Sequence, residues 1–221
     1  MEIEGNLHTN GRINQRGAIG IGAMIIFIAI VLTAGIAAYL IISTGSQLQI
    51  KSSTSGQQTI SEVSTGVKIS TIEAHDTSGA IDKVVIAITP RSGSPDIPLT
   101  STLIELSNHN VKDILSYSST AWVDGTTGVA NIFQANAFPT SGSEFGVIVL
   151  KDEDHSCGQN APVLTRDDSV MLTLNTSAVF GGIAENVNIQ GNVIPPEGSW
   201  GVIFFTTPSS FSQEVLILQE G

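Results

Sequence analysis

Two aspartates and a serine alternate in a short acidic segment at a spacing that metal-binding loops use. Asp152, Asp154 and Ser156 occupy every second position shortly after an apolar run. Their oxygen atoms are hard ligands of the kind that Ca²⁺ prefers. The segment departs from the EF-hand pattern, because Gly158 comes one position too late and Val163 stands at the twelfth position. A site for Ca²⁺ or another divalent cation therefore competes with a solvated acidic turn, and the pattern alone favours the turn.

Two further short patterns bear on other chemistry. Asn175, Thr176 and Ser177 form the N-x-S/T pattern, which occurs once in the chain and predicts a glycan on Asn175. The alternative is a sequon near a strand end that carries no glycan. His155 and Cys157 lie close in sequence, but neighbours along a chain need not face each other. No Ser/His/Asp order, phosphate loop or zinc motif rises above chance, so an enzyme is not expected.

Composition excludes several classes of protein. The 221 residues include 20 acidic and 9 basic side chains, a formal net charge of −11, and charged residues make up only 13% of the chain. The basic residues are scattered singly, so they cannot form the cluster that neutralises phosphates, and a nucleic-acid partner is not expected. A single cysteine excludes an internal disulfide framework. An apolar content of 41% excludes a disordered acidic tail.

The shortage of charge is concentrated in one segment. No charged residue lies between Arg16 and Lys51, and residues 18–42 contain only Thr33 and the Tyr39 hydroxyl as polar side-chain groups. Fifteen of these 25 residues are large and apolar, and they occupy all sides of a helix, so every face needs an apolar partner. The run exceeds the roughly 20 residues that span a bilayer.

The flanking charges predict an orientation for this segment. Arg12 and Arg16 precede it and no comparable positive cluster follows, so the N-terminus is expected in the cytoplasm and residues beyond about 50 outside. The net charge then lies wholly outside, because these arginines offset Glu2 and Glu4. A cleaved secretory signal would have a shorter apolar run and a small-residue cleavage site. A plain single-pass anchor stays open as an alternative.

The residues around Gly17 indicate a family. The tripeptide QRG ends at Gly17, and AIGIGAMIIFIAIVLTAGIAAYLIISTG follows from Ala18. This arrangement resembles the archaeal flagellins (archaellins) of the type IV pilin superfamily, whose leader peptides end in a basic residue and glycine. Bacterial pilins usually carry Glu at the fifth mature position, where this chain has Gly22, as archaellins do. Residues 194–198 and 201–211 resemble the closing strands of the same family.

The resemblance implies three parts. Residues 1–17 are a class III, prepilin-type leader that a membrane-embedded prepilin peptidase removes between Gly17 and Ala18. Residues 18–65 are a hydrophobic assembly helix with a polar continuation, for which a flexible linker is the alternative, and residues 66–221 are an outer domain. Some archaellins bind a metal in the outer domain, which supports a divalent cation there; no cofactor is otherwise required. The side chains expected to drive assembly are Ile19, Ile21, Met24, Ile25, Phe27, Ile28, Val31, Leu32, Ile36 and Leu40.

Beyond Val67 the pattern changes to short β-branched runs between turn residues. It predicts seven to nine strands in an antiparallel, immunoglobulin-like β-sandwich, and with the long N-terminal helix an α+β chain. The expected strands are 67–74, 82–89, 102–106, 128–138, 145–152, 169–176, 185–193, 200–207 and 214–219. The aromatic residues expected in the core or in subunit contacts are Trp122, Trp200, Phe133, Phe145, Phe204 and Phe205.

The resemblance implies a structural function. The chain is expected to be a subunit of the archaellum, a motility filament on the cell surface, and to polymerise with itself or with other archaellins. Its precursor is expected in the membrane, where the archaellum assembly platform receives it. The alternatives are an adhesive type IV pilin, and a membrane-anchored extracellular binding or enzymatic domain that never polymerises.

Overall fold

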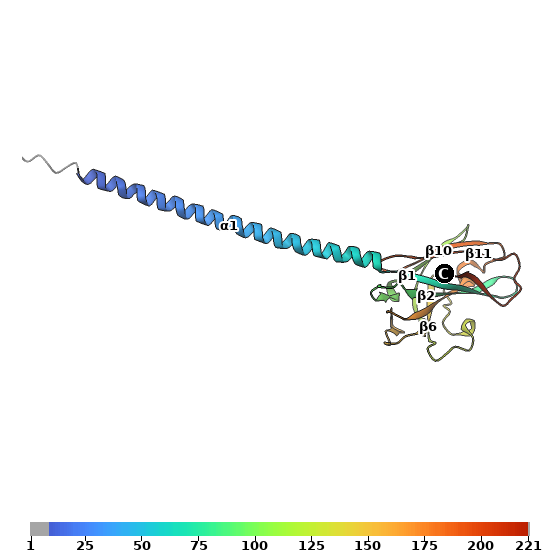
Figure 1. The fold of residues 1–221 in the computed structure, drawn as a ribbon. Coiled ribbons are helices and arrows are strands. Elements are labelled where there is room, and N and C mark those ends of the chain that lie inside the picture. The colour runs from blue at the N-terminus through green and yellow to red at the C-terminus, as the bar shows by residue number, and fades with distance from the viewer. Residues whose placement is uncertain (1–8, 221) are drawn as a thin grey trace, which may run out of the picture. The chain divides into compact units, whose positions relative to one another are not determined.

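A computed structural model of the chain describes residues 9–220, with side chains from residue 17 onward except at 61 and 62. The chain divides into two compact units between Gln57 and Gln58. Helix α1 spans Thr9–Ser64 without interruption (Figure 1), so the polar segment after Ile42 is helical and not a flexible linker. At 1.5 Å per residue the helix is about 80 Å long. Residues 1–8 of the expected leader lie outside the described residues.

The second unit is a mostly antiparallel β-sandwich. Its main sheet has the order β11-β10-β4-β5-β6-β9-β2-β1-β12, and β3, β8 and β7 form a small second sheet. The strands are β1 (Val67–Asp76), β2 (Ile81–Pro90), β3 (Ile97–Pro98), β4 (Leu103–Ser107), β5 (Lys112–Asp124), β6 (Glu144–Lys151), β7 (Cys157–Gly158), β8 (Ala161–Leu164), β9 (Ser169–Asn175), β10 (Asn188–Ile194), β11 (Gly201–Thr206) and β12 (Val215–Glu220), with short helices η1 (Leu99–Ser101), η2 (Ile132–Gln134) and α2 (Thr176–Phe180).

Strand β5 divides the main sheet into two layers. Its first residues, up to Leu115, pair antiparallel with β4, whereas Ser116–Asp124 pair with β6 in parallel. The register of the parallel pairing shifts between Tyr117 and Trp122. Such a strand can leave one layer and join the other. The parallel pair is the exception to the antiparallel sheet that the sequence predicts.

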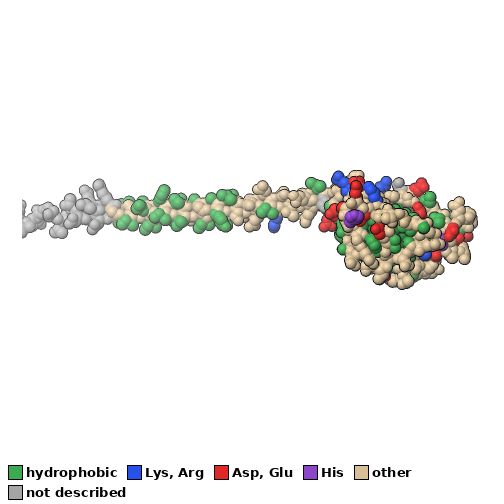
Figure 2. All heavy atoms as spheres, turned by 90° about the horizontal axis from the view of Figure 1, so that it is seen from below, with side chains coloured by type: hydrophobic (Ala, Val, Ile, Leu, Met, Phe, Trp, Pro, Cys, Tyr) green, Lys and Arg blue, Asp and Glu red, His purple; other side chains and the backbone are tan. Residues whose placement is uncertain are grey.

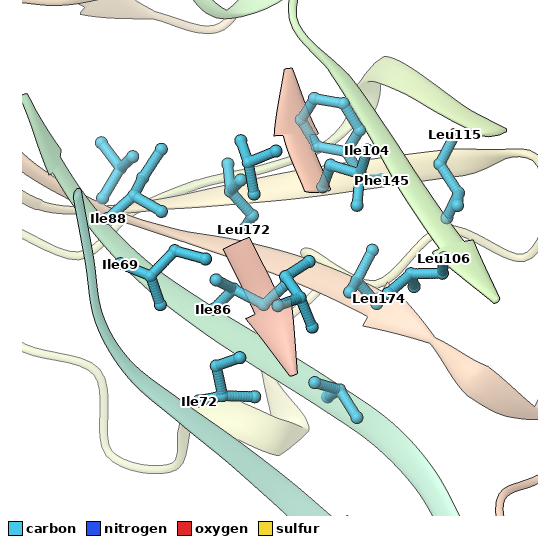
Figure 3. Close-up of a cluster of buried hydrophobic side chains, with 14 of the residues drawn as sticks. Ile69, Ile72, Ile86, Ile88, Ile104, Leu106, Leu115, Phe145, Leu172 and Leu174 are labelled. Carbon is cyan, nitrogen blue, oxygen red and sulfur yellow. The ribbon is translucent and has the colours of Figure 1, made fainter. Parts of the chain in front are cut away.

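The core lies between the two layers. Ile72, Ile86 and Leu172 come from the layer of β1, β2 and β9, while Ile104 and Leu115 come from β4 and β5. Figure 3 shows these side chains in one cluster between the strands. All five are fully buried, and each large apolar side chain removed from water contributes about 1.5 to 3 kcal/mol. In β11 every second residue is buried, which is the pattern of a strand with one solvent-exposed face.

The loop at residues 125–143 covers the outer face of β2, β6 and β9. Phe133 and Ala137 are buried against Val85, Ile148 and Met171 in a second apolar cluster. The strand expected at 128–138 is therefore wrong: this segment is a loop with η2, where the Asn131 side chain accepts a hydrogen bond from the Phe133 N–H. Its apolar residues are buried because they cap a sheet, not because they belong to one.

Close packing of this loop depends on Gly146 in β6. A Cβ at this position would collide with the carbonyl oxygens of Ala137 and Ala121 and would lie 2.6 Å from Thr173 Oγ1. The Thr173 hydroxyl donates a hydrogen bond to the Ala137 carbonyl. The absence of a side chain at Gly146 thus lets the loop, β5 and β9 meet.

We predict that Gly146→Ala destabilises the domain by about 1 to 3 kcal/mol, because the added methyl group meets backbone atoms that cannot move away. Gly158→Ala is the matched control, since Gly158 has no heavy atom within 4 Å of the added Cβ. Denaturant titration of the full chain in detergent measures both variants. Equal midpoints for the two would contradict the packing role of Gly146.

Candidate functional site: the apolar helix surface and the acidic loop

The apolar segment of α1 (residues 18–42) presents large side chains on all sides. Ile19 is 72% exposed, Phe27 69% and Leu40 55%, and the other side chains expected to drive assembly are also more than half exposed. Figure 2 shows hydrophobic side chains along both visible edges of the helix. Among the described residues this is the one helix long and apolar enough to cross a membrane. A surface of this kind requires lipid or protein around it.

Two threonine hydroxyl groups of the helix are satisfied within it. Thr33 Oγ1 donates to the Ala29 carbonyl at 2.9 Å, and Thr44 Oγ1 donates to the Leu40 carbonyl at 2.8 Å. Such back-bonding leaves no free hydroxyl proton at either threonine. The helix can therefore enter dry surroundings without leaving these donors unpaired.

The expected cleavage site lies within α1. Gly17 and Ala18 are both helical and exposed, and no heavy atom comes within 4 Å of the position that a Cβ would take at Gly17. Cleavage between Gly17 and Ala18 stays a prediction.

The acidic loop (residues 152–168) is held in shape by hydrogen bonds to its own carboxylates. Asp152 accepts hydrogen bonds from the N–H groups of Ser156, at 3.1 Å, and Cys157, at 3.0 Å. Asp154 is exposed and accepts from Ser156 N–H and Thr165 Oγ1, and hydrogen bonding, chiefly from Ser156, lowers its pKa. The Ser156 hydroxyl donates to the Val163 carbonyl at 2.7 Å.

Asp168 is the residue of this loop that sequence reasoning missed. It is 1% exposed, and its Oδ2 atom accepts from Thr165 N–H and Thr165 Oγ1, both at 2.8 Å. Its Oδ1 atom is the one buried side-chain oxygen or nitrogen in the described part of the chain without a hydrogen-bond partner. Ligand atoms of Asp152, Cys157 and Asp168 lie within 4.8 Å of one another. Of the three predicted metal ligands, Asp152 belongs to this group, and Ser156 Oγ lies 3.4 Å from Asp168 Oδ2.

Cys157 is held as a neutral thiol. Burial, together with the charges of Asp168 and Asp152, raises its pKa to about 12, and its Sγ atom donates to the Val163 carbonyl at 3.0 Å. Within the described residues no hydrogen bond joins His155 to Cys157. A thiolate nucleophile is therefore disfavoured.

The oxygen atoms around Asp168 suit a hard cation better than a soft one. Asp152 and Asp168 bring two carboxylates together, and no ion pair within the described residues reaches either of them. The Val163 carbonyl and the Ser156 hydroxyl lie at the same place. Ca²⁺ binds carboxylate, carbonyl and hydroxyl oxygens, whereas Zn²⁺ would require the thiolate.

The predicted glycan acceptor is tied into the fold. Asn175 Nδ2 donates to the Pro139 carbonyl at 3.0 Å, while its Oδ1 atom accepts from the Ala178 N–H and caps α2. Thr176 is buried and donates to the Ile81 carbonyl. The amide nitrogen that would carry a glycan is thus already engaged in the folded domain.

Of the six aromatic residues expected in the core or in subunit contacts, Phe133, Phe145 and Phe205 are buried. Trp122 is half-buried, and its indole N–H donates to the Cys157 carbonyl at 3.0 Å, which links β5 to the acidic loop. The remaining two, Trp200 and Phe204, are more than half exposed.

Comparison with known proteins gives consistent matches. The model of the archaeal-type flagellin family matches residues 17–205. Flagellin B2 and flagellin B3 of Methanocaldococcus jannaschii are 43% and 39% identical to this chain, over 93% of it and over 96% and 97% of their own lengths. The crystal structure of archaeal flagellin FlaB1 from the same organism has a TM-score of 0.64 and 31% identity, covering 71% of this chain and 98% of that one. The archaeal flagellum of Methanospirillum hungatei strain JF1 shares the fold, with a TM-score of 0.63, 14% identity and coverage of 90% and 99%.

We predict that Cys157 does not react with thiol reagents in the native chain at pH 8, because a pKa of about 12 leaves a negligible fraction of thiolate. Unfolding in denaturant exposes the thiol and restores the reaction. Alkylation followed by intact mass spectrometry measures both states. Rapid alkylation of the native chain would show that the thiol is not held as described.

Proposed function

The chain belongs to the archaeal-type flagellin family, and from that premise we propose how its two units serve a filament. It is a structural subunit of the archaellum, a motility filament on the cell surface. The observation that carries the proposal is the apolar segment of α1, whose large side chains are exposed on every side. Leaving fifteen such side chains in water would forfeit on the order of 20 kcal/mol or more. The segment is therefore buried against copies of itself in the filament.

Before assembly the same segment lies in the membrane. Its length and composition suit a bilayer, and the arginines before it orient the outer domain to the outside. A prepilin peptidase cleaves between Gly17 and Ala18, and the archaellum assembly platform then moves the helix from lipid into the filament. Ala18 and Gly22, like Ala34 and Ala38, are spaced four apart and let neighbouring helices approach closely. The outer domain has no catalytic role in this scheme.

We predict that Gly17→Val abolishes processing and filaments, because the bulky side chain occupies the residue before the cleaved bond. Gly20→Ala, inside the helix, is the control and keeps both. Mass spectrometry of surface filaments should find a subunit that begins at Ala18, and electron microscopy should show filaments that contain it. An uncleaved N-terminus in filaments of the unaltered chain would contradict the proposed processing. Filaments that lack the chain would contradict the proposed function.

Glycan attachment at Asn175 remains a prediction, with a condition on its timing. Because Asn175 Nδ2 and Oδ1 are both hydrogen-bonded in the folded domain, we propose that transfer occurs before the sandwich closes. The same mass spectra show whether the peptide that contains Asn175 carries a glycan, and an unmodified peptide would contradict the proposal.

We also propose that the outer domain binds one Ca²⁺ ion, or another hard divalent cation, in the acidic loop. Asp152 and Asp168 would hold it, with oxygen from Val163 or Ser156; Asp154 lies at the exposed side. The unpartnered Oδ1 atom of buried Asp168 supports this site, because a buried carboxylate oxygen without a partner is costly. The ion would supply charge compensation and join the two ends of the loop.

We predict that Ca²⁺ raises the thermal midpoint of the chain and that Asp168→Asn removes most of this increase. A ligand at a hundred times its dissociation constant stabilises by about 2.7 kcal/mol. Asp167→Asn is the matched control: Asp167 is exposed and has a positive φ of 68°, a conformation that Asn tolerates. Differential scanning fluorimetry with Ca²⁺ and with a chelator measures the shifts. The same midpoint with and without Ca²⁺ would contradict the site.

A further inference from the structure

One face of the outer domain carries an apolar patch that the fold leaves uncovered. Val202 and Phe204 point outward from β11 and are 61% and 58% exposed. Trp200, just before the strand, is 55% exposed. We call these three residues the β11 patch. Contiguous exposed apolar side chains of this kind mark interaction surfaces.

The surroundings of the β11 patch on β10 are polar, and the nearest charges beyond β10, Glu105 and Lys112, form an ion pair at 2.8 Å. On β10, Gln190 pairs with Phe204 and Asn192 pairs with Val202, which places two amide side chains beside the apolar ones. Residues 188–206 contain a single ionisable side chain, Glu197. A chain with a net charge of −11 repels its own copies, so two copies approach most easily where charges are few or already paired.

The free edge of β11 is closed by a side chain. Gln219 of β12 accepts a hydrogen bond from the Phe204 N–H at 3.0 Å, and its amide donates to the Val202 carbonyl at 3.2 Å. These contacts occupy one N–H and one carbonyl that an added strand would use. A partner therefore meets the face of β11 and does not extend its edge.

We propose that the β11 patch docks on the outer domain of a second copy of this chain. The inference rests on the proposed function, because the helices must first bring copies together. A patch of this kind covers a few hundred Å², whereas a stable free interface buries about 800 Å² on each partner. The patch is thus too small to hold a dimer by itself. It suffices between domains that are already tethered at a high effective concentration.

The test compares unmodified filaments with the same chain solubilised in detergent. Hydroxyl-radical footprinting measures the solvent accessibility of the Trp200 and Phe204 side chains. Exposed His155 in the acidic loop is the reference. We expect the modification of Trp200 and Phe204 to fall severalfold in filaments while that of His155 changes little. Equal modification of the two aromatic residues in both states would overturn the proposal.

A cysteine variant gives an independent reading at the same patch. Val202→Cys places an accessible thiol there, since native Cys157 is buried, and Thr127→Cys is the control at an exposed loop position. With a bulky maleimide, the thiol of the Val202 variant should be protected in filaments and labelled in detergent, while the Thr127 variant is labelled in both. If the Val202 variant does not assemble, footprinting of the unmodified filaments decides.

The outcomes separate the two proposals. If electron microscopy of the unaltered chain shows no filaments, the proposed function fails before the patch is tested. If filaments form and the β11 patch stays as reactive as in detergent, only the docking inference fails. Protection that disappears when filaments are washed free of other surface components would assign the patch to another partner and would also overturn it.

Discussion

The structure depends on one constraint: residues 18–42 cannot remain in water. Their large side chains leave no polar stripe on α1, so the helix cannot rest on the surface of a soluble domain. Lipid and other copies of the helix are two environments that satisfy it, and the proposed function uses both in turn. The internal hydrogen bonds of Thr33 and Thr44 make the same helix acceptable in either environment.

The outer domain meets a different constraint, because its central strands are buried on both faces. β2, β6 and β9 face the core on one side and the loop at 125–143 on the other. That side of the sandwich is closed by the chain itself, and Gly146 allows the close approach. The layer of β10 and β11 has no such cover. The face available for the proposed docking is therefore set by where the covering loop lies.

The sequence alone predicted the elements that a strong local pattern determines. The charge-free run of residues 18–42 left no alternative to a helix, and β-branched runs located most strands. The prediction failed where tertiary context decides. The apolar residues at 128–138 were expected as a strand but form a loop that covers a sheet. The expected strands did not include β5, whose polar, serine-containing segment pairs with strands of both layers. Asp168 was missed because it follows Asp152 by many residues, and only the fold brings the two carboxylates together.

The two interaction surfaces differ in strength, and this difference orders assembly. At about 25 cal/mol per Å², a few hundred Å² of apolar surface at the β11 patch contributes a few kcal/mol at most. The apolar segment contributes several times more. A subunit with a strong outer patch would associate through its outer domain while still in the membrane, before its helix was placed. A weak patch acts only after the helices are packed, so it adjusts how neighbouring outer domains align without deciding whether they assemble.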